Sequence, residues 1–420
     1  MSRNSSPHVL HPGPTSFYGW RIAWTLALTQ TIGYGVLYYA FSVFIKPMEA
    51  ELGWNRTETS LGFSLALLVA GVLAIPVGRW VDRHGARGLM TFGSLLGSLV
   101  VLAWGFVEHR GVFWLLCGGL GVASSMVQYP VAFTVLAVWF KRYRSKAMLI
   151  VTLAAGLAST IFIPLCTGLM YSLGWREALR VLALILAVGT IPAHFLVIRR
   201  CPQDLGLAPD GEAITAQTEG ESSSLTHRQA LSTPTFWWLA LAFSLSSLVA
   251  LAVAAHMVPL LTERGYPTGL AAAAAGSVGL WQLVGRIVYT PLSERLSLFA
   301  LSAGFSALHG AGILCLLGLP GALGLWGFAA LFGLGNGSMS LAKAALVAEM
   351  YGSAHYGSIN GNLTLFTAFT SMLAPLGAGL LHDYAGGYAP ALWILAAASL
   401  GSALAIHRAG RHPIAAEATA

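Results

Sequence analysis

Twelve long apolar stretches dominate this chain of 420 residues. Each holds about 20 or more mostly apolar residues, which is the length that an α-helix needs to cross the ~30 Å hydrocarbon layer of a membrane. Membrane-spanning β-strands would be shorter and would alternate in polarity, so we expect helices. The stretches lie at about residues 20–45, 58–78, 88–107, 112–139, 146–171, 176–198, 236–261, 269–292, 296–317, 321–349, 356–381 and 388–407.

The composition supports a membrane protein and excludes several other classes. Only 9% of the residues are charged, against roughly 25% in a typical soluble domain, and 56% are hydrophobic. A disordered chain, a coiled coil and an ordinary soluble enzyme are therefore excluded. The four cysteines are scattered and form no CxxC pair, so we expect no metal site, no disulfide framework and no cofactor.

One polar connection divides the twelve stretches into six and six. It follows the sixth stretch and is rich in acidic residues, glutamine and serine, which predicts a flexible linker. The expected organisation is a tail over 1–19, a six-helix bundle over 20–198, a linker over 199–235, a second bundle over 236–407 and a tail over 408–420.

The two halves also repeat one another in sequence. Asp82-Arg83 after the second stretch recurs as Glu294-Arg295 after the eighth, 212 positions later. A similar offset relates Pro47 to Pro259 and Pro164 to Pro375. A shared offset indicates duplication of a six-helix unit, an architecture found in transporters that bind their substrate near the midplane.

The distribution of lysine and arginine predicts the orientation. With the N-terminus inside, the inner loops and tails carry fifteen of these residues and the outer loops five. Cytoplasmic loops are enriched in basic residues, so we expect both termini on the cytoplasmic side of the cell (inner or plasma) membrane, with a retained N-terminal tail. The net charge of +7 then reflects topology and the anionic inner leaflet rather than nucleic-acid binding.

The loop after the second stretch reads GRWVDRHGAR over residues 78–87. It resembles the G-x-x-x-D-R-x-G-x-R loop of the major facilitator superfamily, except that the usual final basic residue is Gly88 here. The resemblance implies two pseudo-symmetric six-helix bundles whose contacts through this loop break as the carrier changes conformation. A basic loop that only fixes topology is the alternative. The implied gating residues are Gly78, Asp82, Arg83, Gly85 and Arg87, with Glu294 and Arg295 in the second half.

Shorter motifs narrow the resemblance. Tyr18-Gly19-Trp20 precedes the first stretch, Trp139-Phe140-Lys141-Arg142 precedes the fifth, and Gly174-Trp175-Arg176 precedes the sixth. Together they are similar to the monocarboxylate-porter and oxalate/formate-exchanger branch of the superfamily.

Charges inside the stretches indicate a site, because each costs several kcal/mol in the membrane unless it faces water or a partner. Arg286 shares a helix face with Gln282, and Lys343 shares one with Asn336. By resemblance, Arg286 holds the carboxylate of a substrate. The alternatives are snorkelling of either side chain to the interface and, for Lys343, a pair with Glu349.

Two departures from the branch weaken the expectation of proton coupling by the usual route. A lysine in the first stretch and an aspartate one turn before the arginine are replaced by Tyr39 and Gln282. His256 in the seventh stretch is a candidate for coupling, with a structural hydrogen-bonded histidine as the alternative.

Polar and aromatic side chains line one face of the first and fourth stretches. Tyr34 and Tyr38 fall on one stripe, and Gln128 and Tyr129 lie together in the fourth stretch. They either line a cavity or join helices through hydrogen bonds.

The sequence therefore predicts a secondary carrier rather than an enzyme. No GxxxxGK[ST] motif for ATP and no HExxH motif for a metalloprotease occurs. We expect symport or antiport of a small, monocarboxylate-like organic anion by a monomer in the lipid bilayer, without ATP or nucleic acid. The alternative is efflux of an amphipathic or toxic compound.

Overall fold

The computed structural model describes residues 17–211 and 225–411, which are almost entirely helical and contain no strand. The first bundle consists of α1 (Tyr18–Tyr34), a π-helical segment (Gly35–Tyr39), α2 (Ala40–Leu52), α3 (Arg56–His84), α4 (Arg87–Trp104), α5 (Arg110–Val127), α6 (Tyr129–Trp139), α7 (Arg144–Gly156), α8 (Ala158–Leu173) and α9 (Trp175–Val197). The second consists of α11 (Pro234–Glu263), α12 (Thr268–Ser293), α13 (Leu298–Gly318), α14 (Gly321–Tyr351), α15 (Tyr356–Ala385) and α16 (Ala389–Gly410).

Among the described residues, eleven helical spans are long and apolar enough to cross a membrane. The twelfth crossing of the architecture is α14, which is less apolar because it carries Asn336, Lys343 and Glu349. The all-helical fold in two bundles is therefore confirmed.

Three spans of the first bundle are interrupted, whereas the sequence predicts continuous helices. A π-helical segment separates α1 from α2, Gln128 takes an extended conformation between α5 and α6, and Leu157 separates α7 from α8. Broken helices are tolerated in a membrane only where the freed backbone groups face protein or a cavity. We therefore expect the backbone groups at these three breaks to face other parts of the protein or a cavity rather than lipid.

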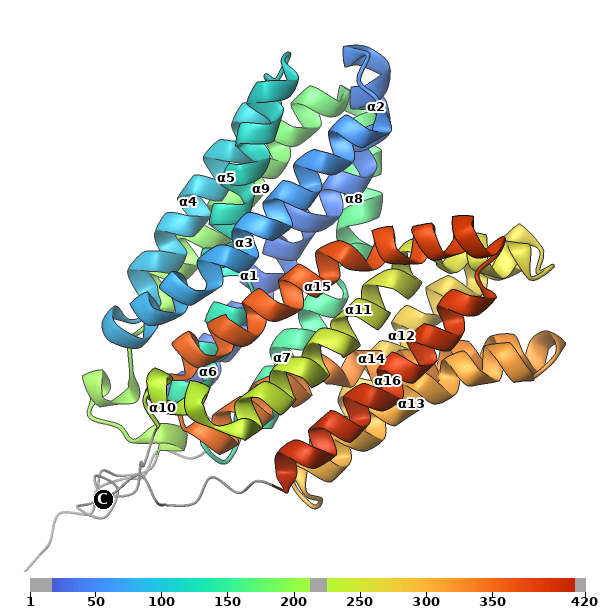
Figure 1. Cartoon of the computed structure of the whole chain (residues 1–420). Coiled ribbons are helices and arrows are strands. Elements are labelled where there is room, and N and C mark those ends of the chain that lie inside the picture. Colours follow the sequence, from blue (N-terminus) through green and yellow to red (C-terminus); the bar gives the residue numbers. More distant parts are fainter. Residues whose placement is uncertain (1–16, 212–224, 412–420) are drawn as a thin grey trace, which may run out of the picture.

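The two bundles meet along α3 and α15, which lie side by side in Figure 1. Small residues bring the helices close: Gly71 faces Ala368, and a Cβ on Gly78 would lie 2.1 Å from the carbonyl oxygen of Gly357. Such residues allow close backbone approach in membranes. The contacts run from the middle of α3 to the end of the molecule at which the linker helix α10 (His227–Ser232) lies. We call this end of the molecule the linker side and the opposite end the far side.

The linker is anchored at both of its described ends by hydrogen bonds to the bundles. On the first bundle, the Asp210 carboxylate accepts hydrogen bonds from the backbone N–H groups of Lys141 (3.0 Å), Arg142 (2.6 Å) and Tyr143 (3.3 Å), just before α7. On the second bundle, His227 is hydrogen-bonded to the Asn362 amide of α15 at 2.6 Å. Residues 212–224 lie outside the described residues.

We predict that Asp210→Gly destabilises the linker side of the first bundle. Glycine adopts the positive φ of Asp210 (62°) without strain, so the substitution isolates the loss of the carboxylate. Hydrogen bonds to a charged group contribute about 1.5–3 kcal/mol each, so the midpoint of thermal unfolding in detergent should fall by several degrees. Asp204→Gly is the control, because among the described residues the Asp204 carboxylate accepts a hydrogen bond from the Cys201 thiol alone, at 3.3 Å. Equal effects of the two variants would contradict the prediction.

Candidate substrate-binding site

Arg286 joins the two bundles. On α12, its Nε donates a hydrogen bond to the Gly337 carbonyl of α14 at 3.2 Å. Its Nη1 donates to the Thr152 carbonyl of α7, in the other bundle, at 2.5 Å. The guanidinium therefore lies between the bundles rather than against lipid, and it is held by neutral backbone oxygens.

Gly156, at the end of α7, makes room for this contact. A Cβ at this position would lie 2.9 Å from Nη1 of Arg286 and 2.7 Å from Leu283, both of α12. Any larger residue would therefore push the guanidinium away from the Thr152 carbonyl, one turn earlier on α7. Gly156 is thus a positioning residue for Arg286.

Aromatic side chains form a wall in the first bundle, near Arg286. The rings of Tyr34 and Tyr129 are 4.7 Å apart, and Tyr38 contacts Tyr34 (6.4 Å) and Phe63 (5.4 Å) between ring centroids. These tyrosines and Arg286 keep partial solvent exposure although they lie deep within the spans. The predicted aromatic residues therefore lie together.

The π-helical segment carries a further tyrosine into this region. Tyr39, the last residue of the segment, packs edge-on against Tyr38, with ring centroids 5.2 Å apart. The sequence comparison with the branch identifies Tyr39 only as the residue in place of a lysine. Nothing in the sequence predicts the π-helix. Such segments occur frequently at functional sites, since the extra residue per turn redirects side chains.

The break in the fourth span leaves polar atoms without partners. The Gln30 amide of α1 donates to the Val127 carbonyl at 2.5 Å, at the last residue of α5. The Oε1 atoms of Gln30 and Gln128 are buried and accept no hydrogen bond within the described chain. Buried polar groups are rarely left unsatisfied, so these oxygens are available to a ligand or water.

The remaining predicted site residues are placed differently. Gln282 and Asn336 are half-buried on α12 and α14, and neither side chain makes a hydrogen bond within the described part of the chain. Lys343 points toward α15, where its Nζ donates to the Thr364 hydroxyl at 3.5 Å. Lys343 forms no ion pair with Glu349 among residues 17–211 and 225–411.

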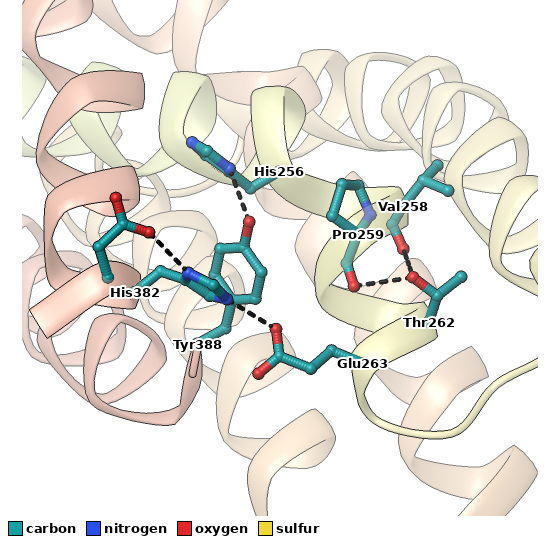
Figure 2. A network of polar contacts seen from close by, with 8 residues as sticks. His256, Val258, Pro259, Thr262, Glu263, His382 and Tyr388 are labelled. Carbon is teal, nitrogen blue, oxygen red and sulfur yellow. Dashed lines mark hydrogen bonds and ion pairs between the residues drawn. The ribbon is translucent and has the colours of Figure 1, made fainter. Parts of the chain in front are cut away.

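His256 lies in a separate network toward the far side of the second bundle (Figure 2). Its Nδ1 contacts the Tyr388 hydroxyl at 3.0 Å and its Nε2 contacts the Pro375 carbonyl at 2.9 Å. Because a carbonyl only accepts, Nε2 carries the proton and Nδ1 accepts from Tyr388 in the neutral ring. Nearby, His382 bridges Glu263 (3.0 Å) and Asp383 (3.1 Å). These bonds tie α11 to α15 and to the start of α16.

Asp82 connects the bundles on the linker side. Its carboxylate accepts from the backbone N–H groups of Gly357 and Ser358, both at 2.8 Å, at the start of α15. A carboxylate at a helix N-terminus is favoured by hydrogen bonds and by the helix dipole. Asp82 forms no ion pair with an arginine within the described residues.

Among the other predicted gating residues, Gly78 packs against Gly357 of the second bundle, and the rest do not join the bundles in the described part of the chain. Arg87 donates to the Phe195 carbonyl at 2.7 Å in its own bundle, and Gly85 (φ 78°) turns the loop against Arg200. Arg83, Glu294 and Arg295 are exposed and make no hydrogen bond or ion pair with the described chain. The repeat in sequence is therefore not a repeat in contacts.

Loss of Asp82 should open the linker side. Asp82→Ala removes two charge-assisted hydrogen bonds, each contributing about 1.5–3 kcal/mol, so the equilibrium should shift more than tenfold away from the closed arrangement. Distances between spin labels on the linker-side loops of the two bundles would measure this shift. Glu294→Ala is the matched control, and a shift of the same size there would contradict the prediction.

A bulkier residue at Gly156 should weaken the contact between Arg286 and the Thr152 carbonyl. Gly156→Ala should displace Arg286 from Thr152 and increase the linker-side distance between the bundles in the same measurement. Gly168→Ala in α8 is the control, since a Cβ there meets nothing within 4 Å. Unchanged distances in both variants would show that the Arg286–Thr152 contact does not hold the bundles together.

Comparisons with known proteins agree with the fold. A sequence profile of the Major Facilitator Superfamily matches residues 26–361. The chain is 24% identical to the uncharacterized MFS-type transporter YcxA of Bacillus subtilis, over 88% of this chain and 90% of the relative. It is 25% identical to monocarboxylate transporter 13 of Bos taurus, over 89% and 85%.

Solved structures show the same fold. The major facilitator transporter FucP in its outward conformation superimposes with a TM-score of 0.71 at 13% identity, over 91% of this chain and 97% of FucP. A bacterial homologue of the iron transporter ferroportin, in an outward-facing state, gives a TM-score of 0.73 at 15% identity, over 93% and 99%. The chain is thus a multi-pass membrane protein that belongs to the Major Facilitator Superfamily.

Proposed function

We propose that this protein is a secondary active transporter that moves a small organic anion with one carboxylate by alternating access. The observation that carries the proposal is the place of Arg286, a cation between the bundles whose acceptors are two neutral carbonyl groups. No carboxylate of the described residues pairs with Arg286, so its charge is available to an anion.

The geometry suggests how binding and conformational change are linked. A guanidinium binds a carboxylate through two parallel hydrogen bonds, and charge-assisted bonds are roughly twice as strong as neutral ones. A substrate carboxylate would therefore replace the Thr152 carbonyl at Nη1. Substrate binding would then remove one of the contacts that close the linker side.

The organic part of the substrate would lie against the first bundle. We propose that Tyr34, Tyr38 and Tyr129 supply an apolar surface, with the unpaired oxygen of Gln128 as a hydrogen-bond acceptor. Gln282, Asn336 and Lys343 would complete the lining on the second bundle.

Relatives support this class without defining the substrate. They include monocarboxylate transporter 13 and an oxalate:formate antiporter of Oxalobacter formigenes, which is 24% identical over 55% of this chain and 53% of the antiporter. We infer the same class of charged cargo for this chain.

Coupling, orientation and assembly complete the proposal. His256 is the proposed coupling residue. The alternative is a structural histidine, and the partners of both ring nitrogens favour that alternative. We further propose cytoplasmic termini in the cell membrane, a functional monomer, and transport without ATP or nucleic acid.

Efflux of an amphipathic compound is the second candidate. The aromatic wall favours it, because tyrosine and phenylalanine rings bind apolar groups without requiring charge. Under this alternative Arg286 would only close the linker side.

Substitution of Arg286 separates the two functions. Arg286→Gln should reduce uptake of the transported carboxylate at least 100-fold, in a proteoliposome panel of radiolabelled small carboxylates with and without a pH gradient, because a buried charged bond is lost. Arg286→Lys should restore only part of it, since lysine lacks the planar fork. Arg295→Gln is the charge-matched control. Full transport by Arg286→Gln would overturn the proposed site and favour an uncharged substrate.

A further inference from the structure

Two motifs that do not take part in the proposed transport site meet on the linker side of the first bundle. Tyr18 and Trp20, at the start of α1, pack against Trp139 and Phe140 at the end of α6, with ring centroids 5.7 Å (Tyr18–Trp139) and 4.9 Å (Trp20–Phe140) apart. The Tyr18 hydroxyl also donates to the Val197 carbonyl of α9 at 2.9 Å. The motifs thus build one aromatic cluster at the ends of three helices.

A groove of about 940 Å³ lies beside this cluster, between the start of α1 and the end of α9. Its lining includes Tyr18, Trp20, Arg21, Trp24, Leu196 and Val197.

The part of the groove that points toward the middle of the membrane is lined by exposed apolar side chains. Trp24 is 62% exposed and Leu196 is 61% exposed, and Leu28 continues the exposed face of α1 at 56%. These side chains belong to membrane spans, so their exposed faces contact lipid. Tryptophan is enriched at the boundary between headgroups and acyl chains, which places the mouth of the groove at headgroup level.

Two cations lie at the edge of the groove: Arg21 lines it, and Lys146 lies beside the ring of Trp20, which also lines it. No carboxylate pairs with Arg21 or Lys146 in the described part of the chain. Lys146 lies 5.7 Å from the Trp20 ring, and Arg21 lies 6.0 Å from the Tyr18 ring. Of the nearby acids, Asp210 is occupied by three backbone N–H groups. The charge at the rim is therefore left for a ligand.

We propose that this groove binds an anionic phospholipid. The phosphate group contacts Arg21, with Lys146 at the rim, and one acyl chain follows Trp24, Leu28 and Leu196 toward the middle of the membrane. Basic pockets between spans bind anionic headgroups by the same chemistry. A zwitterionic lipid offers no net charge to this rim, so charge selects the occupant.

Native mass spectrometry of the full chain in detergent tests the proposal. Phosphatidylglycerol and phosphatidylcholine with identical acyl chains are titrated separately. The wild type should bind phosphatidylglycerol at least tenfold more tightly. Arg21→Gln with Lys146→Gln should abolish this preference, since each basic residue near a membrane surface contributes about fivefold.

Three controls decide the interpretation. Arg295→Gln with Arg408→Gln removes the same charge from the linker side of the second bundle and should leave the preference intact. Inorganic phosphate should not displace the lipid, and Trp24→Ala should weaken binding of both lipids, because acyl contact is shared. Equal affinities for the two lipids in the wild type, displacement by inorganic phosphate, or a preference that appears only after deletion of residues 2–16 would each overturn the proposal.

Discussion

A guanidinium inside a membrane must be held by acceptors, and this constraint organises the centre of the molecule. The acceptors of Arg286 come from both bundles, Gly337 on α14 and Thr152 on α7. An isolated charge would cost several kcal/mol at this depth, so the conformation that supplies the second acceptor is favoured. The closeness of α7 and α12, which Gly156 permits, is therefore a consequence of satisfying one charge.

The linker side shows that a duplicated sequence need not give duplicated contacts. Asp82 holds the start of α15 across the bundles, whereas its counterpart Glu294 is exposed. Before α7, the span that corresponds to α15, the N–H groups are instead satisfied by Asp210 of the linker. Backbone groups at both helix starts require an acceptor, and a carboxylate from a different part of the chain meets the requirement in each half. The Asp82 contact joins the two bundles, whereas the Asp210 contact joins the linker to the first bundle.

Much of this fold could be predicted from the sequence, because the length and apolarity of a membrane span leave little freedom. The twelve stretches and the place of a lone arginine, Arg286, inside one of them follow from residue types alone, and the family follows from the resemblance of the loop over residues 78–87. The partners of Arg286 do not, because a backbone carbonyl such as that of Thr152 exists at every position and carries no sequence signal. The break at Gln128 is equally hidden, since neighbouring Tyr129 and Pro130 also fit a continuous span. Composition predicts a flexible linker around Asp210, and it carries no sign that three backbone N–H groups bind the Asp210 carboxylate.

Because the Thr152 acceptor is a neutral carbonyl, a ligand can compete with it for Arg286. A ligand shifts an equilibrium only by its difference in affinity between two states. If the acceptor of Arg286 were a carboxylate, a substrate anion would gain little by replacing it. A carbonyl is the weaker partner, so the anion that we propose as the substrate would bind with a net gain even though it would break an interbundle bond. The Asp82 contact remains after this exchange, so the bundles stay together until the second connection is also lost. The two contacts therefore differ in kind: one can be released by a ligand, and the other must be broken by the movement itself.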